Sequence, residues 1–183
     1  MRIVAGKFRG KALTSPSDDS IRPTADRVRE SLFSMLASRL GPNFTGVRVL
    51  DLFAGTGALG LEALSRGASS IMFVDTGTEA RGLIRDHIEA FGAGGIAKLM
   101  RRDATDLGSV GNIKPFDLIF LDPPYGKGLG ERALAALLDG RWLASGALCL
   151  LEESADVEVI LPAGYALLER REYGDTQVLF LRA

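Results

Sequence analysis

The stretch VRVLDLFAGTGALG, residues 47–60, joins an apolar run to a turn that is dense in glycine. The apolar residues between Val47 and Leu52 predict a buried strand of a parallel sheet. Gly55, Gly57 and Gly60 allow the backbone to approach a ligand closely. They also satisfy the dinucleotide-binding pattern G-x-G-x-x-G, which is weak evidence by itself. The stretch therefore predicts a nucleotide-like cofactor site at a strand-to-helix turn.

The composition is that of a single-domain globular protein. The chain of 183 residues contains 46% apolar and 25% charged residues, the balance of an ordinary soluble domain. Its apolar runs are far shorter than the roughly 20 residues of a membrane span, and its start lacks the apolar core of a signal peptide. We therefore expect a cytoplasmic protein that does not enter a membrane. Cys149 is expected in the core, and the lone His87 is expected to be solvated or to cap a helix.

Strands and helices alternate after residue 47, and this order predicts an α/β fold with a parallel sheet covered by helices on both faces. A final pair of extended segments around Gly174-Asp175 predicts an antiparallel hairpin, with a reversed strand at the end of the sheet. Thr24 is the expected cap of the first helix, which Gly41-Pro42 ends. The expected strands are 47–52, 70–75, 97–101, 116–121, 147–152, 165–173 and 177–181, and the expected helices are 24–40, 58–66, 79–91 and 131–139.

The beginning of the chain is predicted to be a basic extension of the domain. Short extended pieces around Gly6 and Gly10 predict a β-hairpin. We therefore divide the chain into an N-terminal extension at residues 1–21 and a main domain at residues 22–183. The alternative interpretation of the extension is a solvated tail.

Residues 1–13 carry four positive charges and no acid. Such a cluster attracts phosphate, and four contacts to one nucleic-acid strand would give a salt slope of about −3. Arg27 and Arg29 are expected to point away from the packed face of the first helix and, with Arg22, to extend this basic character. The candidate RNA-binding residues are Arg2, Lys7, Arg9, Lys11, Arg22 and Arg27.

Four aspartates follow four consecutive predicted strands: Asp51, Asp75, Asp103 and Asp122. In an open α/β sheet, ligands bind outside the carboxyl ends of the strands. Asp51 suits the cationic end of a cofactor, Asp75 a ribose diol and Asp103 an adenine amine. A pyrophosphate would meet the negative charge of Asp51, which argues against NAD and for a sulfonium compound.

The fourth strand ends in the tetrad Asp122, Pro123, Pro124 and Tyr125. The prolines stiffen the turn and leave carbonyl oxygens as acceptors, Asp122 adds another acceptor, and Tyr125 adds a flat aromatic face. Acceptors beside a ring suit a nucleobase with an exocyclic amine, and a paired base would have to swing out to reach them. The alternative is a rigid turn without a ligand.

With DLFAGTG at 51–57 and DPPY at 122–125, the chain resembles the class I S-adenosylmethionine-dependent methyltransferases. RPTADRVRESLF at 22–33 and YGDTQ at 173–177 make it similar to the RsmD-type 16S ribosomal RNA guanine-N2 methyltransferases over essentially its full length. The resemblance implies a Rossmann-like, seven-stranded sheet with an N-terminal hairpin extension, in a monomer that methylates a guanine of small-subunit ribosomal RNA. It also implies that Asp122, Pro123, Pro124 and Tyr125 hold the target base. The implied cofactor-binding residues are Asp51, Phe53, Ala54, Gly55, Gly57, Asp75, Thr76, Asp103 and Ala104.

The expected reaction is in-line attack of the amine on the sulfonium methyl, without a metal, promoted mainly by positioning of the two substrates. The proton then leaves to Asp122 or to solvent. The substrate is expected in an assembled or assembling 30S subunit. Three alternatives stay open: an adenine-N6 or other amino-methyltransferase acting on DNA or other RNA, a Rossmann-type NAD oxidoreductase, and a non-catalytic RNA-binding module.

Overall fold

The sheet of this protein has seven strands in the order β3-β2-β1-β4-β5-β7-β6. The structure is a computed structural model and describes residues 1–16 and 26–183. The first five strands pair in parallel, and β7 runs antiparallel to both of its neighbours. The strands are β1 (Arg48–Leu52), β2 (Ser70–Val74), β3 (Ala97–Met100), β4 (Phe116–Leu121), β5 (Leu143–Ser154), β6 (Ala166–Tyr173) and β7 (Thr176–Arg182).

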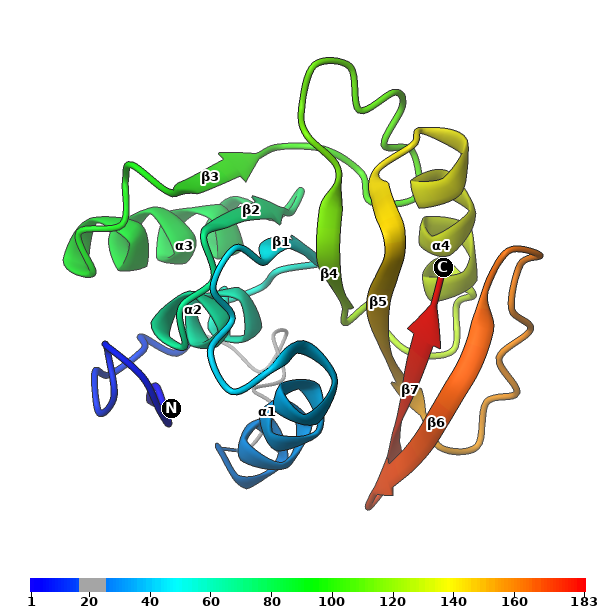
Figure 1. Ribbon diagram of the computed structural model, residues 1–183, viewed down its shortest axis with the longest axis horizontal. Helices are drawn as coiled ribbons and strands as arrows, with labels where there is room; N and C mark the ends of the chain where they lie inside the picture. Colours follow the sequence, from blue (N-terminus) through cyan, green and yellow to red (C-terminus); the bar gives the residue numbers. More distant parts are fainter. Residues whose placement is uncertain (17–25) are drawn as a thin grey trace.

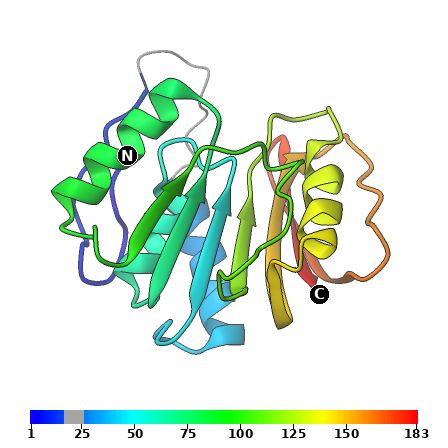
Figure 2. The same cartoon turned by 90° about the horizontal axis from the view of Figure 1, so that it is seen from above.

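Helices cover both faces of the sheet, as Figures 1 and 2 show. One apolar cluster lies between the sheet and α1, α2 and α3, and a second lies between the opposite face and α4. No helix in the described ranges is both long and apolar enough to cross a membrane. The helices are α1 (Asp26–Leu40), α2 (Ala58–Ser65), α3 (Thr78–Ala90) and α4 (Leu129–Asp139).

The predicted α/β fold with its seven-stranded sheet is confirmed, with two corrections. The fifth strand begins at Leu143, four residues before the expected start. The reversed strand is not at the edge of the sheet, because β7 is buried along nearly its whole length between β5 and β6, whereas β6 is mostly exposed. Cys149 is fully buried in the core as predicted. The predicted cap Thr24 lies outside the described residues.

The N-terminal segment, residues 1–16, folds back on itself in a short antiparallel pairing. A single antiparallel bridge joins Arg2 and Ala12. The segment buries Ile3, Phe8 and Leu13 in the same apolar cluster as α1 and α2, and Figure 2 shows it running alongside α3. Burial of these three side chains attaches the segment to the domain, so the solvated-tail interpretation is wrong for residues 1–16.

Glu62 of α2 anchors this segment by hydrogen bonds. Its carboxylate is fully buried and accepts the backbone N–H groups of Val4, at 2.8 Å, and Ala5, at 3.0 Å. The same carboxylate accepts Nε–H of Arg66, one helical turn later, at 2.8 Å. A buried charge is tolerated only when it is paired and hydrogen-bonded. Glu62 meets this condition through the N-terminal segment and Arg66.

Arg29 also differs from its prediction. Its guanidinium is fully buried, not turned to solvent, and it donates to the carbonyl oxygen of Arg2 and to the Asp26 carboxylate at 2.7 Å. Helical periodicity could not anticipate this position, because the group that covers Arg29 comes from the N-terminal segment. The prediction that this side chain extends an exposed basic surface is wrong.

His87 of α3 is buried as well, which corrects the expectation of a solvated or capping histidine. Its Nε2 accepts the backbone N–H of Thr14 at 2.9 Å, and its Nδ1 lies 2.9 Å from the carbonyl oxygen of Thr56. An N–H donor at Nε2 and a carbonyl at Nδ1 require the neutral ring with its proton on Nδ1. The ring therefore links the N-terminal segment to the glycine-rich turn.

We predict that Glu62→Ala lowers the free energy of unfolding by about 3 kcal/mol or more, because it leaves buried donors without an acceptor. For a domain of this size, that change lowers the melting temperature by roughly 6 to 12 °C. Urea denaturation followed by circular dichroism measures it. The exposed Glu89→Ala on α3 is the control, and equal stability of the two variants would contradict the anchoring role.

Candidate active site

A cavity of about 550 Å³ opens at the carboxyl edge of β1, β2 and β4. Ligands of open α/β sheets bind at this edge, where the order of the strands reverses. All four predicted aspartates and the whole DPPY tetrad line it. The predicted site residues on its wall are Asp51, Phe53, Ala54, Gly55, Asp75, Thr76, Asp103, Ala104, Asp122, Pro123, Pro124 and Tyr125.

The register of the parallel strands explains why these residues meet. Leu52 of β1 pairs with Val74 of β2 and with Leu121 of β4, and Leu121 pairs with Leu151 of β5. The next residue on each strand is therefore at the same level of the edge. Those residues are Asp75, Phe53, Asp122 and Glu152, and each of them lines the cavity.

The glycine-rich turn shapes one wall of this cavity. Gly55 has a φ of 58° and Gly57 a φ of 78°, in the left-handed region that glycine tolerates best. Gly57 is the only predicted cofactor residue that is not on the cavity wall; it precedes α2, and a Cβ there would lie 3.1 Å from the Phe73 ring. A Cβ at Gly60 would lie 2.6 Å from the same ring, so these two glycines allow α2 to pack closely on the sheet.

Asp75 connects the loops that follow β1 and β2. Its Oδ2 accepts the N–H of Gly55 at 2.9 Å, and its Oδ1 accepts the N–H of Gly77 at 2.7 Å. Each carboxylate oxygen carries a second lone pair. The side chain can therefore hold both loops and still accept hydrogen bonds from a diol in the cavity.

Asp51 is a buried carboxylate in which only one of the two oxygens has a hydrogen-bond partner. Its Oδ2 accepts the N–H of Gly60 at 2.9 Å, whereas its buried Oδ1 has no hydrogen-bond partner. Burial raises the pKa of this carboxyl well above its usual range; the bond from Gly60 lowers it in part, and the Asp75 charge raises it further. A buried acceptor without a donor, on the wall of a cavity, fits a ligand that brings a donor or a positive charge.

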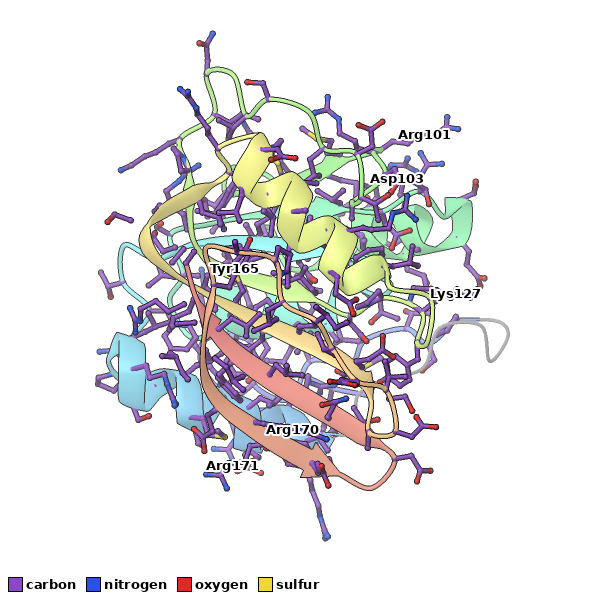
Figure 3. All side chains as sticks on the ribbon, turned by 90° about the vertical axis from the view of Figure 1, so that its right-hand side faces the viewer. Arg101, Asp103, Lys127, Tyr165, Arg170 and Arg171 are labelled. Carbon is purple, nitrogen blue, oxygen red and sulfur yellow. The ribbon has the colours of Figure 1, made fainter. Side chains whose placement is uncertain are left out.

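Asp103 also lines the cavity, and it is exposed to solvent after β3 (Figure 3). Its Oδ1 accepts the hydroxyl of Thr105 at 2.7 Å and the N–H of Thr105 at 2.8 Å. These bonds lower the pKa of the Asp103 carboxyl. The side chain is thus an ionised acceptor at the rim, next to the buried Ala104.

The tetrad is fixed to the strands beside it through the phenol of Tyr125. This hydroxyl donates to Oε1 of Glu152 at 2.6 Å and lies 3.3 Å from Oγ1 of Thr176 on β7. Burial and the neighbouring Glu152 carboxylate raise the pKa of the phenol, so it remains a donor. The N–H of Gly126 also donates to Oε1 of Glu153 at 2.9 Å. Two residues of β5 thus hold the turn in place.

Several residues of the cavity wall were not predicted. Glu152 directly follows the buried apolar residues 147–151 of β5, and that signal, which identified the aspartates, could have identified it. Thr56 lies within the glycine-rich turn and Arg102 directly precedes Asp103. The predicted residues beside them could therefore have identified both. Met1 had no such signal, because the folded-back N-terminal segment brings it to the cavity.

The predicted RNA-binding cations of residues 1–16 are all exposed, but some have protein partners. Arg2 lies 3.7 Å from Asp26, and the Lys11 ammonium donates to the Ala90 carbonyl oxygen at 3.1 Å. The Lys7 ammonium stands 5.2 Å from the centre of the Phe8 ring. Arg9 and, on α1, Arg27 are exposed, and Arg22 lies outside the described residues.

Within residues 1–16 and 26–183, no three His, Cys, Asp or Glu side chains gather in a way that could hold a metal ion.

Known proteins share this fold and much of this sequence. The Haemophilus influenzae protein named ribosomal RNA small subunit methyltransferase D is 34% identical over 176 residues, covering 95% of this chain and 89% of that protein. Its Escherichia coli counterpart of the same name is 34% identical over 175 residues, covering 95% and 85%. A solved structure from Escherichia coli, yhhF, described as a candidate methyltransferase, is 32% identical with a TM-score of 0.84, covering 100% of this chain and 97% of that one.

A family model described as Conserved hypothetical protein 95 matches residues 1–182. The match includes the glycine-rich turn, the tetrad and the N-terminal segment, so it covers every part of the cavity wall described above. The chain belongs to the Conserved hypothetical protein 95 family.

Proposed function

We propose that this protein transfers a methyl group from S-adenosylmethionine to the exocyclic N2 amine of a guanine in small-subunit ribosomal RNA. One observation carries the proposal: a single cavity joins a half-paired buried carboxylate, Asp51 of β1, to the DPPY tetrad at the end of the neighbouring strand β4. The first element suits a positively charged donor and the second an amine-bearing base.

The cofactor part of the cavity has the acceptors that an adenosine bearing a cationic chain requires. Oδ1 of Asp51 would take a positive or N–H group of the methionine part, Asp75 the ribose hydroxyls, and Asp103 the adenine amine. Phe53, with a φ of 55°, and Ala54 would flank this group. When bound, S-adenosylmethionine supplies an electrophilic methyl group.

The tetrad positions the acceptor amine. Asp122 and the carbonyl oxygen of Pro123 accept hydrogen bonds from the amine, which draws its lone pair out of conjugation and directs it toward the methyl donor. Tyr125 offers its ring face to the base, and base stacking on such a ring contributes about 1 to 3 kcal/mol. The proton leaves to Asp122 or to solvent. Most of the rate comes from holding two substrates in one attack geometry.

We propose ribosomal RNA as the substrate because the names of the relatives give the RNA of the small ribosomal subunit as their target. With that substrate, the enzyme acts as a monomer in the cytoplasm on an assembled or assembling 30S subunit. Transfer of tritiated methyl groups to small subunits, naked ribosomal RNA and duplex DNA tests the proposal. Methylated guanine in the small subunit is the expected product, and N6-methyladenine in DNA would contradict it.

Asp122→Ala is expected to lower methyl transfer to small subunits about a hundredfold or more, because the amine loses an acceptor that acts in the transition state. Its affinity for S-adenosylmethionine should stay within about threefold of the wild type. Single-turnover kinetics and calorimetry measure the two quantities. Asp139→Ala, at the exposed end of α4, is the control, and a fully active Asp122→Ala enzyme would refute the base-positioning role.

Asp51→Asn should stabilise the protein while it weakens cofactor binding. The pKa of Asp51 is higher in the folded chain than in the unfolded one, so the wild type loses stability as pH rises through that folded-state pKa. The neutral amide avoids this loss and still accepts from Gly60. We expect a gain of about 1 to 3 kcal/mol at pH 8 without cofactor.

The same variant should bind S-adenosylmethionine at least about tenfold more weakly, because the buried charge pair is lost. Denaturation at pH 5 and pH 8, with calorimetric titration of the cofactor, separates the two effects. Asp86→Asn on the exposed face of α3 is the control. Unchanged affinity together with lower stability would show that Asp51 is a structural group only.

The exposed cations of the N-terminal segment are expected to contact phosphate. Replacing Lys7 and Arg9 together by alanine should weaken RNA binding and reduce the magnitude of the salt slope by about 1.4, with cofactor affinity unchanged. Filter binding at several salt concentrations measures the slope. Arg170→Ala with Arg171→Ala on β6 removes two cations from another part of the surface (Figure 3). An equal effect of both double variants would contradict a local contact.

A further inference from the structure

Glu152 is a second carboxylate beside the tetrad. Because Leu121 of β4 pairs with Leu151 of β5, the following residues, Asp122 and Glu152, stand next to each other on neighbouring parallel strands. Neighbouring strands are about 4.8 Å apart, and both residues line the cavity. A base held by Asp122 therefore lies within reach of Glu152.

The hydrogen bond from Tyr125 fixes the position of this carboxylate. The phenol donates to Oε1 at 2.6 Å, which ties Glu152 to the ring on which the base is proposed to stack. An ionised carboxylate offers about four lone-pair positions, so a carboxylate at this place can accept from more than one donor at a time. Its position is set before any substrate arrives.

We infer that Glu152 selects guanine by accepting its N1–H, while Asp122 and the Pro123 carbonyl accept its N2 amine. This inference rests on the proposed function and names the group that distinguishes the base. Guanine presents two adjacent donors on its Watson–Crick edge, N1–H and the N2 amine, and extruded bases are read along that edge. Two neighbouring acceptors on β4 and β5 complement that pair.

Adenine presents the opposite pattern beside its amine. Its N1 is an acceptor, so an adenine whose N6 amine occupied the tetrad would place a lone pair against the Glu152 carboxylate. In a site that excludes water, two acceptors that face each other without a donor are strongly unfavourable, so adenine would be rejected. The tetrad alone accepts either amine, and Glu152 supplies the discrimination.

Glu152→Gln separates base recognition from support of Tyr125. The amide oxygen still accepts the phenol, so the turn keeps its shape, and the amide N–H group then faces the base as a donor. This donor opposes guanine N1–H but matches a base whose N1 is an acceptor. If Glu152 had only a structural role, its replacement by glutamine would have little effect on which base is methylated.

The test uses small-subunit RNA joined by splinted ligation and reconstituted with guanine or 2-aminopurine at the methylated position. 2-Aminopurine keeps the N2 amine and lacks only N1–H and O6. The wild type should prefer guanine in kcat/KM by roughly 10- to 100-fold, the range of a base-specific contact. In Glu152→Gln this preference should fall at least about tenfold, with affinity for S-adenosylmethionine unchanged.

Glu158→Gln, an exposed carboxylate after β5, is the matched control and should keep the wild-type preference. A wild type that methylates no ribosomal RNA would overturn the proposed function. A wild type that methylates guanine, with a Glu152→Gln variant that keeps the full preference over 2-aminopurine, would overturn only the assignment of Glu152.

Discussion

The geometry of the site depends on the parallel register of β2, β1, β4 and β5. Val74, Leu52, Leu121 and Leu151 form one buried row across these strands, and the site residues occupy the next row. A slip of one residue would turn a whole strand over and remove its carboxylate from the edge. Because helices cover these strands on both faces, such a slip would also draw the polar residue at the end of the strand into the apolar core or move an apolar residue to the edge. The packing of the core thus fixes the positions of the acceptors in the cavity.

Buried carboxylates in this protein differ in how fully they are paired, and the difference separates support from function. Glu62 accepts hydrogen bonds at both oxygens from the N-terminal segment and from Arg66, so its pairing is internal to the fold. Asp51 is almost equally buried, yet one of its oxygens has no partner, and the residue lines the cavity. An unpaired buried acceptor costs stability in the free protein and is expected where a ligand completes the bonding. The site is therefore less stable than the rest of the core until it is filled.

The sequence allowed prediction of the strands and of the acids that follow them, because a buried parallel strand appears as a continuous apolar run and its carboxyl end as the first polar residue. Asp75 and Asp122 were found in this way. Two other polar residues could not be placed, because their partners are distant in the sequence. Arg29 is covered by Arg2, and His87 bonds to Thr14 and Thr56. Periodicity describes one helix at a time, so it cannot show that a second segment covers the polar face.

The same distant contacts determine how the basic N-terminal segment relates to the site. Glu62 and His87 hold residues of this segment against α2 and α3, and His87 also contacts the carbonyl of Thr56 in the glycine-rich turn. A segment that is already ordered loses little conformational entropy when it meets RNA. Its cations also keep a fixed distance from the cavity, since both rest on the same helices. In the proposed function, phosphate contacts made by this segment therefore position the target base relative to the tetrad in addition to increasing affinity.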